Sequence, residues 1–99
     1  MRRQYYAHYY RNFGNTYDLI YADTEDDLKQ IPEEAERITR KKAESLCSAE
    51  NYRRKYDPNF SGFADNMIYP VGLDTYDRCD IYNDHRFYKS GYIWERSAV

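Results

Sequence analysis

Tyrosine supplies thirteen of the 99 residues, whereas Leu, Ile, Val and Phe together supply only sixteen. Aliphatic side chains therefore cannot provide most of the burial that this protein needs to fold. A Tyr ring has a large apolar body and a polar tip, so it can lie partly in a core and partly in water. Tyr is also favoured at binding surfaces, because it gives a large contact area for few rotatable bonds. We expect the tyrosines both to build the core and to contact a partner.

The length fits one compact domain spanning residues 1–99. Few aliphatic residues can indicate disorder, but an aromatic content of 18% with only four Gly and three Pro favours a folded protein. The formal net charge of -2 is too small for the whole protein to act as a polycation or a polyanion, so any electrostatic recognition is local. The sequence shows no membrane span and no secretion signal, so the expected compartment is the cytoplasm of a bacterial cell.

The N-terminal part of the sequence is predicted to form a β-hairpin. Residues 4–10 have a strand-forming composition with tyrosines at both odd and even positions, so both faces of this strand are aromatic and both are expected to be covered. Residues 16–22 follow a Gly- and Asn-containing turn and form the second strand. Carboxylates then precede a short helical turn over residues 26–31, and residues 63–69 are a further candidate strand.

The main helix is predicted to begin after Thr39 and to end at Tyr56. Thr39 is a good N-cap residue, and Ile38 and Ala43 occupy the two positions of a hydrophobic staple. The segment contains no Gly or Pro until Pro58, and its apolar residues recur at spacings of three and four. The sequence therefore predicts an α+β fold, in which a small antiparallel β-sheet with an N-terminal hairpin packs against one main α-helix. Residues 86–94 fit either a terminal hairpin or a strand followed by a loop.

Two groups of residues are predicted to contact a protein partner. One strand cannot direct four tyrosines into one core, so some of them are expected at a partner surface or at a homodimer interface. The spaced aspartates of residues 74–84 lack the residue order of a calcium loop, so they form either a solvated acidic face or a contact to a basic groove on a partner. The predicted partner-binding residues are Tyr5, Tyr6, Tyr9, Tyr10, Asp74, Asp77, Asp80 and Asp84.

Basic residues near both ends of the main helix support a second interpretation. Lys and Arg beside tyrosines can bind phosphates while the rings stack on bases. The alternative is a solvated helix face whose charge is offset by Glu44 and Glu50. The candidate nucleic-acid-binding residues are Arg40, Lys41, Lys42, Arg53, Arg54 and Lys55.

The sequence contains no recognised catalytic or metal-binding arrangement. His8 is expected to be packed or at the surface, and His85 is expected in an exposed loop. Cys47 is expected to be a small buried side chain, and neither Cys47 nor Cys79 has the spacing of a zinc ligand. Both are expected to be reduced thiols, and a disulfide between them is the alternative. We therefore expect no catalytic residue, no cofactor and no metal, and a function other than that of an enzyme.

Two segments resemble a group of small proteins. The Tyr-rich residues 4–10 with their Asn-Phe-Gly-Asn turn, and the segment Ala-Glu-Arg-Ile-Thr-Arg-Lys-Lys-Ala-Glu of residues 35–44, look like short proteins encoded by bacteriophages and mobile elements. That group includes anti-CRISPR proteins, which inhibit host defence. The resemblance covers about the first half of the sequence and implies a compact, non-enzymatic inhibitor that occupies a surface its target needs.

Two functional hypotheses follow. The first is a non-catalytic protein-binding domain of the anti-CRISPR type, which blocks a bacterial defence nuclease such as a CRISPR-Cas effector sterically. The second is a small nucleic-acid-binding or regulatory protein that uses the basic ends of the main helix and Tyr stacking. Affinity for DNA or RNA that falls steeply with salt distinguishes the second hypothesis from the first.

Overall fold

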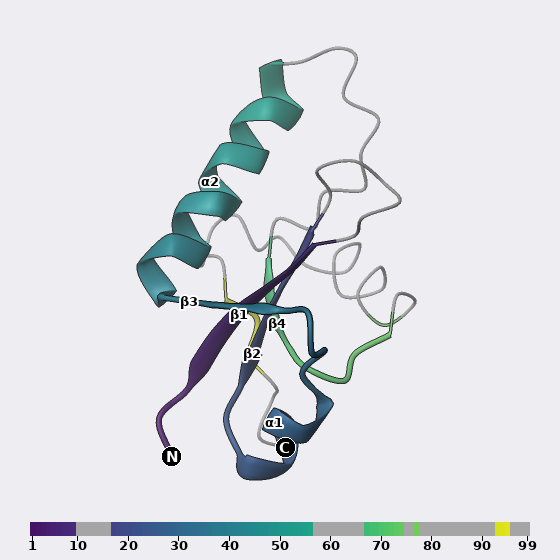
Figure 1. Ribbon diagram of the computed structural model, residues 1–99. Coiled ribbons are helices and arrows are strands. Elements are labelled where there is room, and N and C mark those ends of the chain that lie inside the picture. Colours follow the sequence, from purple (N-terminus) through teal and green to yellow (C-terminus); the bar gives the residue numbers. More distant parts are fainter. Residues whose placement is uncertain (10–16, 57–66, 75–76, 78–92, 96–99) are drawn as a thin grey trace.

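The computed structural model describes residues 1–9, 17–56, 67–74, 77 and 93–95, with residues 49–56 described by their backbone alone. The described residues form an α+β fold of four strands and two helices, which confirms the predicted fold class (Figure 1). In sequence order the elements are β1 (Gln4–Tyr9), β2 (Tyr17–Ala22), α1 (Glu25–Gln30), β3 (Glu36–Ile38), α2 (Arg40–Tyr56) and β4 (Ile68–Pro70).

The strands form one sheet in the order β3-β1-β2-β4. β1 and β2 form the predicted N-terminal antiparallel hairpin, in which Tyr5 pairs with Tyr21. β3 pairs antiparallel with β1 at the other side, and this three-residue strand is absent from the sequence prediction. β4 runs parallel to β2, so the sheet is mixed and not wholly antiparallel as predicted. A parallel return is possible because the connection between β2 and β4 is long and includes both helices.

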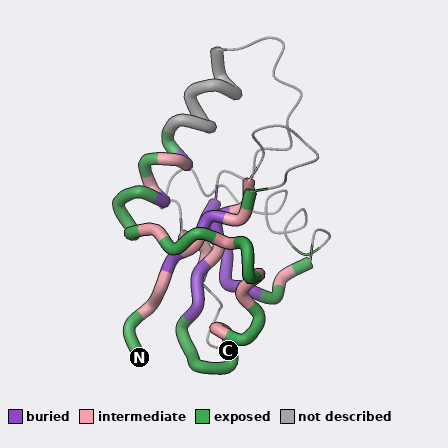
Figure 2. The backbone as a smooth tube through the Cα atoms, viewed as in Figure 1, coloured by how far each residue is buried: buried purple, intermediate pink, exposed green. Residues whose placement is uncertain are grey.

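Helix α2 covers one face of the sheet, and the core lies between them (Figure 1). Alternate residues of β1 and β2 point to this face, which explains why Tyr5 is buried while Tyr6 is only half-buried. Figure 2 shows the buried residues gathered in the strands at the centre of the sheet. Ala43 and the fully buried Cys47 belong to the side of α2 that faces the core. The buried core cluster consists of Tyr5, Ala7, Leu19, Tyr21, Ala43, Cys47 and Ile68.

Both helices begin at a threonine cap. Thr24 accepts a hydrogen bond from the Asp27 N–H, and the Asp27 side chain accepts one from the Thr24 N–H, so α1 has a reciprocal capping box. Thr39 Oγ1 accepts a hydrogen bond from the Lys42 N–H at 3.1 Å, as predicted for the start of the main helix. α1 ends at Gln30, one residue earlier than predicted, because Ile31 precedes Pro32 and adopts an extended conformation.

A second apolar cluster joins β4 to residues 93–95. Met67 and Tyr69 are buried, and the half-buried Leu73 and Trp94 pack against them. The Trp94 N–H donates to the Ile68 carbonyl at 3.0 Å, which fixes this segment to β4. Of the predicted strand at 63–69, residues 68–69 lie in β4, whereas residues 63–66 and most of the segment 86–94 lie outside the described residues.

The helices in the described part of the protein are too short or too polar to cross a membrane.

Candidate functional site

The four tyrosines predicted to contact a partner differ in how far the structure buries them. Tyr5 is only 8% exposed and belongs to the core, so its ring is not an exposed anchor. Tyr6 is half-buried, and its hydroxyl donates to the Gln4 side chain at 2.8 Å. Tyr9 is 43% exposed, with its ring centroid 5.5 Å from that of Tyr17, and it is the one well-exposed tyrosine among those whose side chains are described. Tyr10 lies outside the described residues.

The predicted charged residues are described in part. Asp74 and Asp77 are exposed, and the Asp77 N–H donates to Asp74 Oδ1 at 2.8 Å, so the two lie together at one turn. Asp80 and Asp84 lie outside the described residues. Of the predicted basic residues, Arg40, Lys41 and Lys42 are exposed in the first turn of α2. Arg53, Arg54 and Lys55 belong to the last turns of α2, where only the backbone is described.

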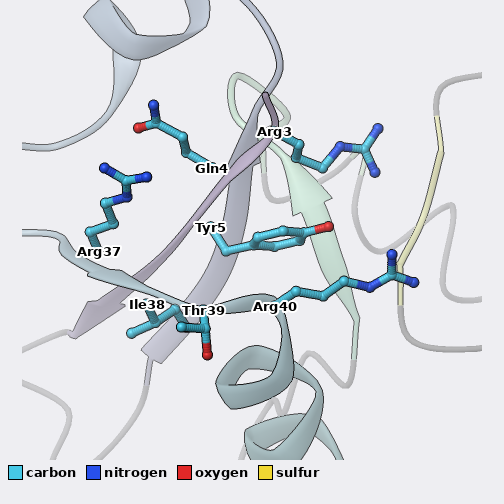
Figure 3. A pocket seen from close by; sticks show the side chains of 7 residues that line it. All are labelled: Arg3, Gln4, Tyr5, Arg37, Ile38, Thr39 and Arg40. Atoms are coloured by element: carbon cyan, nitrogen blue, oxygen red, sulfur yellow. The ribbon is translucent and has the colours of Figure 1, made fainter. Parts of the chain in front are cut away.

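An open pocket of about 490 Å³ lies where β1 begins and β3 leads into α2 (Figure 3). Three arginines from these elements line it, together with the phenol of Tyr5, which lies between the side chains of Arg3 and Arg40 (Figure 3). The pocket therefore combines a basic lining with one phenol hydroxyl. Its lining residues are Arg3, Gln4, Tyr5, Arg37, Ile38, Thr39 and Arg40.

Arg3 is the most firmly held cation of the pocket, because two carboxylates bind it. Its guanidinium donates to both oxygens of Asp23 at 2.6 and 3.0 Å and to both oxygens of Glu95 at 2.5 and 2.7 Å. Hydrogen bonds to Glu95 and then to Asp23 raise the Arg3 pKa, and the hydrogen bond from Arg3 lowers the Glu95 pKa. Arg3 thus joins the start of β1 to the end of β2 and to residues 93–95.

Arg40 binds one carboxylate, whereas Arg3 binds two. Its Nε donates to Glu44 Oε1 at 3.1 Å, one helical turn further along α2. This hydrogen bond raises the Arg40 pKa above its ordinary value. A guanidinium carries five N–H donors, so the terminal nitrogens of Arg40 can bind a further acceptor.

Charge changes sign along the sequence at β3. Residues 23–36, here called the acidic segment, contain a single Lys, whereas residues 37–42, the basic segment, contain no carboxylate. The acidic segment carries seven carboxylates, those of Asp23, Glu25, Asp26, Asp27, Glu33, Glu34 and Glu36; the basic segment carries Arg37, Arg40, Lys41 and Lys42. The first four residues of the basic segment line the pocket, directly after Glu36, the last carboxylate of the acidic segment.

The described residues contain no group of three or more His, Cys, Asp or Glu side chains placed to hold a metal ion. His8 Nε2 lies 3.0 Å from Glu34 Oε1, which links β1 to the acidic segment. Cys47 is a fully buried thiol, as predicted for it. Cys79 and His85 lie outside the described residues.

Sequence reasoning missed most of the pocket. It named Arg40 and Tyr5 for different functions, whereas the structure brings them together with Arg3 and Arg37. The short strand β3 creates this site, and a segment of Glu, Arg and Ile has no two-residue alternation long enough to indicate a strand. The signal that could have indicated the site is the abrupt change of charge at residue 37.

The comparisons with known proteins give no match. A scan against protein-family models finds none that fits the sequence, and searches of curated proteins and of solved structures find no similar protein. The class of protein is therefore defined by its own geometry, as an α+β domain with an open, arginine-lined pocket beside an edge strand.

Proposed function

We propose that this protein is a protein-binding domain that acts without catalysis, through the surface formed by β3 and the acidic and basic segments that it joins. The observation that carries this proposal is the change of charge across β3, with an open pocket at the junction. Complementary charge on a partner orients it and speeds association. A protein surface can offer both signs of charge within a short distance.

This charge arrangement favours a protein over a nucleic acid. A nucleic acid presents negative charge along its whole backbone. The basic segment would attract it, but the exposed Glu33, Glu34 and Glu36 lie directly before that segment and would repel the continuing strand. A protein that places basic groups against the acidic segment and acidic groups against the basic segment avoids this repulsion.

The specific form that we propose is a phage-type inhibitor of a bacterial defence nuclease. Such a nuclease needs a basic groove to hold nucleic acid. The acidic segment offers carboxylates that could occupy such a groove, with Glu25, Asp26 and Glu33 all exposed. The inhibitor would then act by covering the groove. The resemblance of residues 4–15 and 35–44 to short phage proteins supports the same form.

Affinity capture with a matched charge variant tests the protein-binding proposal. The purified protein is immobilised, exposed to candidate defence nucleases, and compared with a double variant, Glu33→Lys with Glu36→Lys, which reverses charge only in the acidic segment. The wild type should retain a nuclease and lower its DNA cleavage, whereas the double variant should lose at least tenfold in affinity. Ser45→Lys is the control, because Ser45 is exposed on α2 outside the acidic segment.

Failure of the wild type to retain any candidate nuclease or to change its cleavage would contradict the inhibitor form. Equal retention by the double variant would contradict the role of the acidic segment.

Nucleic-acid binding is the second candidate, because Arg40, Lys41 and Lys42 are exposed together beside the pocket. A titration of labelled DNA and RNA at two salt concentrations tests it. The second candidate predicts micromolar or tighter binding that weakens steeply with salt, and the protein-binding proposal predicts no such binding.

A further inference from the structure

The hydroxyl of Tyr5 is aimed into the pocket, and no residue in the described part of the protein is its hydrogen-bond partner. More than nine-tenths of the Tyr5 residue is buried, since it is 8% exposed, and its ring lies 6.4 Å from the Tyr21 ring. Figure 3 shows the phenol directed between the ends of the Arg3 and Arg40 side chains. The described residues therefore leave this hydroxyl available at the pocket as a donor and acceptor for a ligand.

Further donors surround this hydroxyl. Arg40 uses Nε for Glu44, which leaves its terminal nitrogens for a second acceptor. The start of α2 adds positive potential, because the first N–H groups of a helix lack an intrahelical acceptor, and Thr39 caps that of Lys42. Because α2 is 17 residues long, its aligned peptide dipoles give its N-terminus the full partial positive charge of a helix. An acceptor placed here would meet a hydroxyl, a guanidinium and a helix N-terminus together.

We propose that the pocket binds one carboxylate group of the protein partner, at the Tyr5 hydroxyl and the terminal nitrogens of Arg40. This inference rests on the proposed protein-binding function and names the group that the partner supplies. The carboxylate comes from an Asp or Glu side chain or from the C-terminus of the partner. Both sources offer the same two oxygens, which suit the planar guanidinium.

The charge balance of the pocket disfavours a doubly charged ligand. Arg3 and Arg40 carry two positive charges against the three carboxylates of Asp23, Glu95 and Glu44, and Arg37 brings the total to neutral, so a ligand here is held by directed hydrogen bonds and not by net charge. A phosphate monoester carries close to two negative charges and would be poorly balanced here. The half-buried Ile38 adds an apolar wall that fits the methylenes beside a carboxylate. Arg3 also shows that the protein itself places carboxylates at this cluster.

A titration with small probes tests the site without any partner protein. The probes are N-acetylglutamic acid α-amide for the carboxylate of an acidic residue, N-acetylglycine for a C-terminal carboxylate, methyl phosphate, and neutral acetamide. The readout is the NMR signal of the Arg40 Nε–H and of the backbone amides at the start of α2. We expect saturable shifts with at least one carboxylate probe and none with acetamide, and the tighter carboxylate probe identifies the source.

Three variants make the assignment specific. Tyr5→Phe keeps the core ring and removes only the hydroxyl, so carboxylate affinity should fall about tenfold. Arg40→Gln should also weaken it. Glu44→Gln removes the carboxylate that competes for Arg40 and should strengthen binding several-fold, a gain that a poorly folded variant cannot give. Tyr9→Phe is the matched control and should bind as the wild type does.

Each contrary result overturns the inference. The carboxylate site is wrong if no probe gives saturable shifts at tens of millimolar, if Tyr5→Phe binds equally well, or if methyl phosphate binds more tightly than both carboxylates. Because the titration uses no partner, its failure leaves the affinity-capture result standing. Failure of the capture experiment would instead remove the proposed function.

Discussion

The guanidinium carbon of Arg3 lies 4.0 Å from the centroid of the Tyr21 ring. Arg3 therefore stacks on a core ring while its N–H groups bind Asp23 and Glu95. A cation over an aromatic face is attracted by the negative charge density of the ring. Arg3 therefore links three segments at one end of the sheet, namely the start of β1, the end of β2 and residues 93–95.

Replacing Arg3 should destabilise the fold. Arg3→Ala removes the stacking and two bidentate ion pairs, and because Asp23 and Glu95 are partly exposed we expect a loss of about 1–2 kcal/mol in the free energy of unfolding. Arg3→Lys should lose about half of that, since a Lys cannot bind bidentately. Urea denaturation measures both. Arg2→Ala is the control because Arg2 is exposed, and a loss equal to that of Arg3→Ala would contradict the role of this ion-pair cluster.

Acid should remove part of this stability. The hydrogen bond from Arg3 holds the Glu95 pKa below its ordinary value. A carboxyl group whose pKa is lower in the folded state stabilises the fold above its unfolded pKa, and this contribution is lost as the pH falls through the folded value. The difference in unfolding free energy between the wild type and Glu95→Gln should therefore be largest near neutral pH and shrink towards about pH 3.

Urea midpoints of both proteins across that pH range, at one fixed salt concentration, check this expectation. Raised salt should reduce the difference near neutral pH, because Glu95 is exposed enough to be screened. A difference that stays constant from neutral to acid pH would show that Glu95 does not contribute through its charge.

The hydroxyl of Tyr21 should hold residues 93–95 in place. It donates to the Trp94 carbonyl at 2.7 Å from a ring that is 2% exposed. Tyr21→Phe should cost about 1 kcal/mol, since the carbonyl loses this donor. Trp94 is the single tryptophan of the protein, so its fluorescence reports on this segment directly. We expect a red shift of its emission in Tyr21→Phe and no shift in Tyr9→Phe, and unchanged emission in both would contradict the link.

The elements that depend on local sequence were predictable. The hairpin of β1 and β2 and the long helix α2 follow from strand composition, a turn, and a threonine cap, all within a few residues of one another. β3 was not predictable, because its three residues become a strand only through pairing with Tyr5, Tyr6 and Ala7. The direction of β4 depends in the same way on a partner strand far away in the sequence.

The candidate site also combines features that local sequence predicts with features that depend on distant strand pairing. The basic turn of α2 is visible in the sequence, but its meeting with Arg3 depends on the placement of β1 beside β3. Alternation along β1 predicted that Tyr5 and Tyr6 face opposite sides, yet not which side the helix covers. Tyr5 consequently became a core residue with a polar tip at the pocket, rather than an exposed anchor.

The two threonine caps should differ in their effect on global stability. Loss of an N-cap hydroxyl costs about 1 kcal/mol in the helix concerned. Thr39→Ala weakens α2, whose Ala43 and Cys47 are fully buried in the core, so the whole loss should appear in the free energy of global unfolding. Thr24→Ala weakens α1, which has no buried residue and can open locally while the sheet remains folded.

Urea denaturation and amide hydrogen exchange separate these two outcomes. Thr39→Ala should lower the urea midpoint, and Thr39→Ser should restore it because serine keeps the hydroxyl acceptor. Thr24→Ala should leave the midpoint nearly unchanged while exchange at residues 25–30 becomes faster, since the cap of α1 holds only that turn. Equal losses of midpoint in both alanine variants would show that α1 unfolds together with the sheet and that its acidic first turn is part of the same cooperative unit as α2.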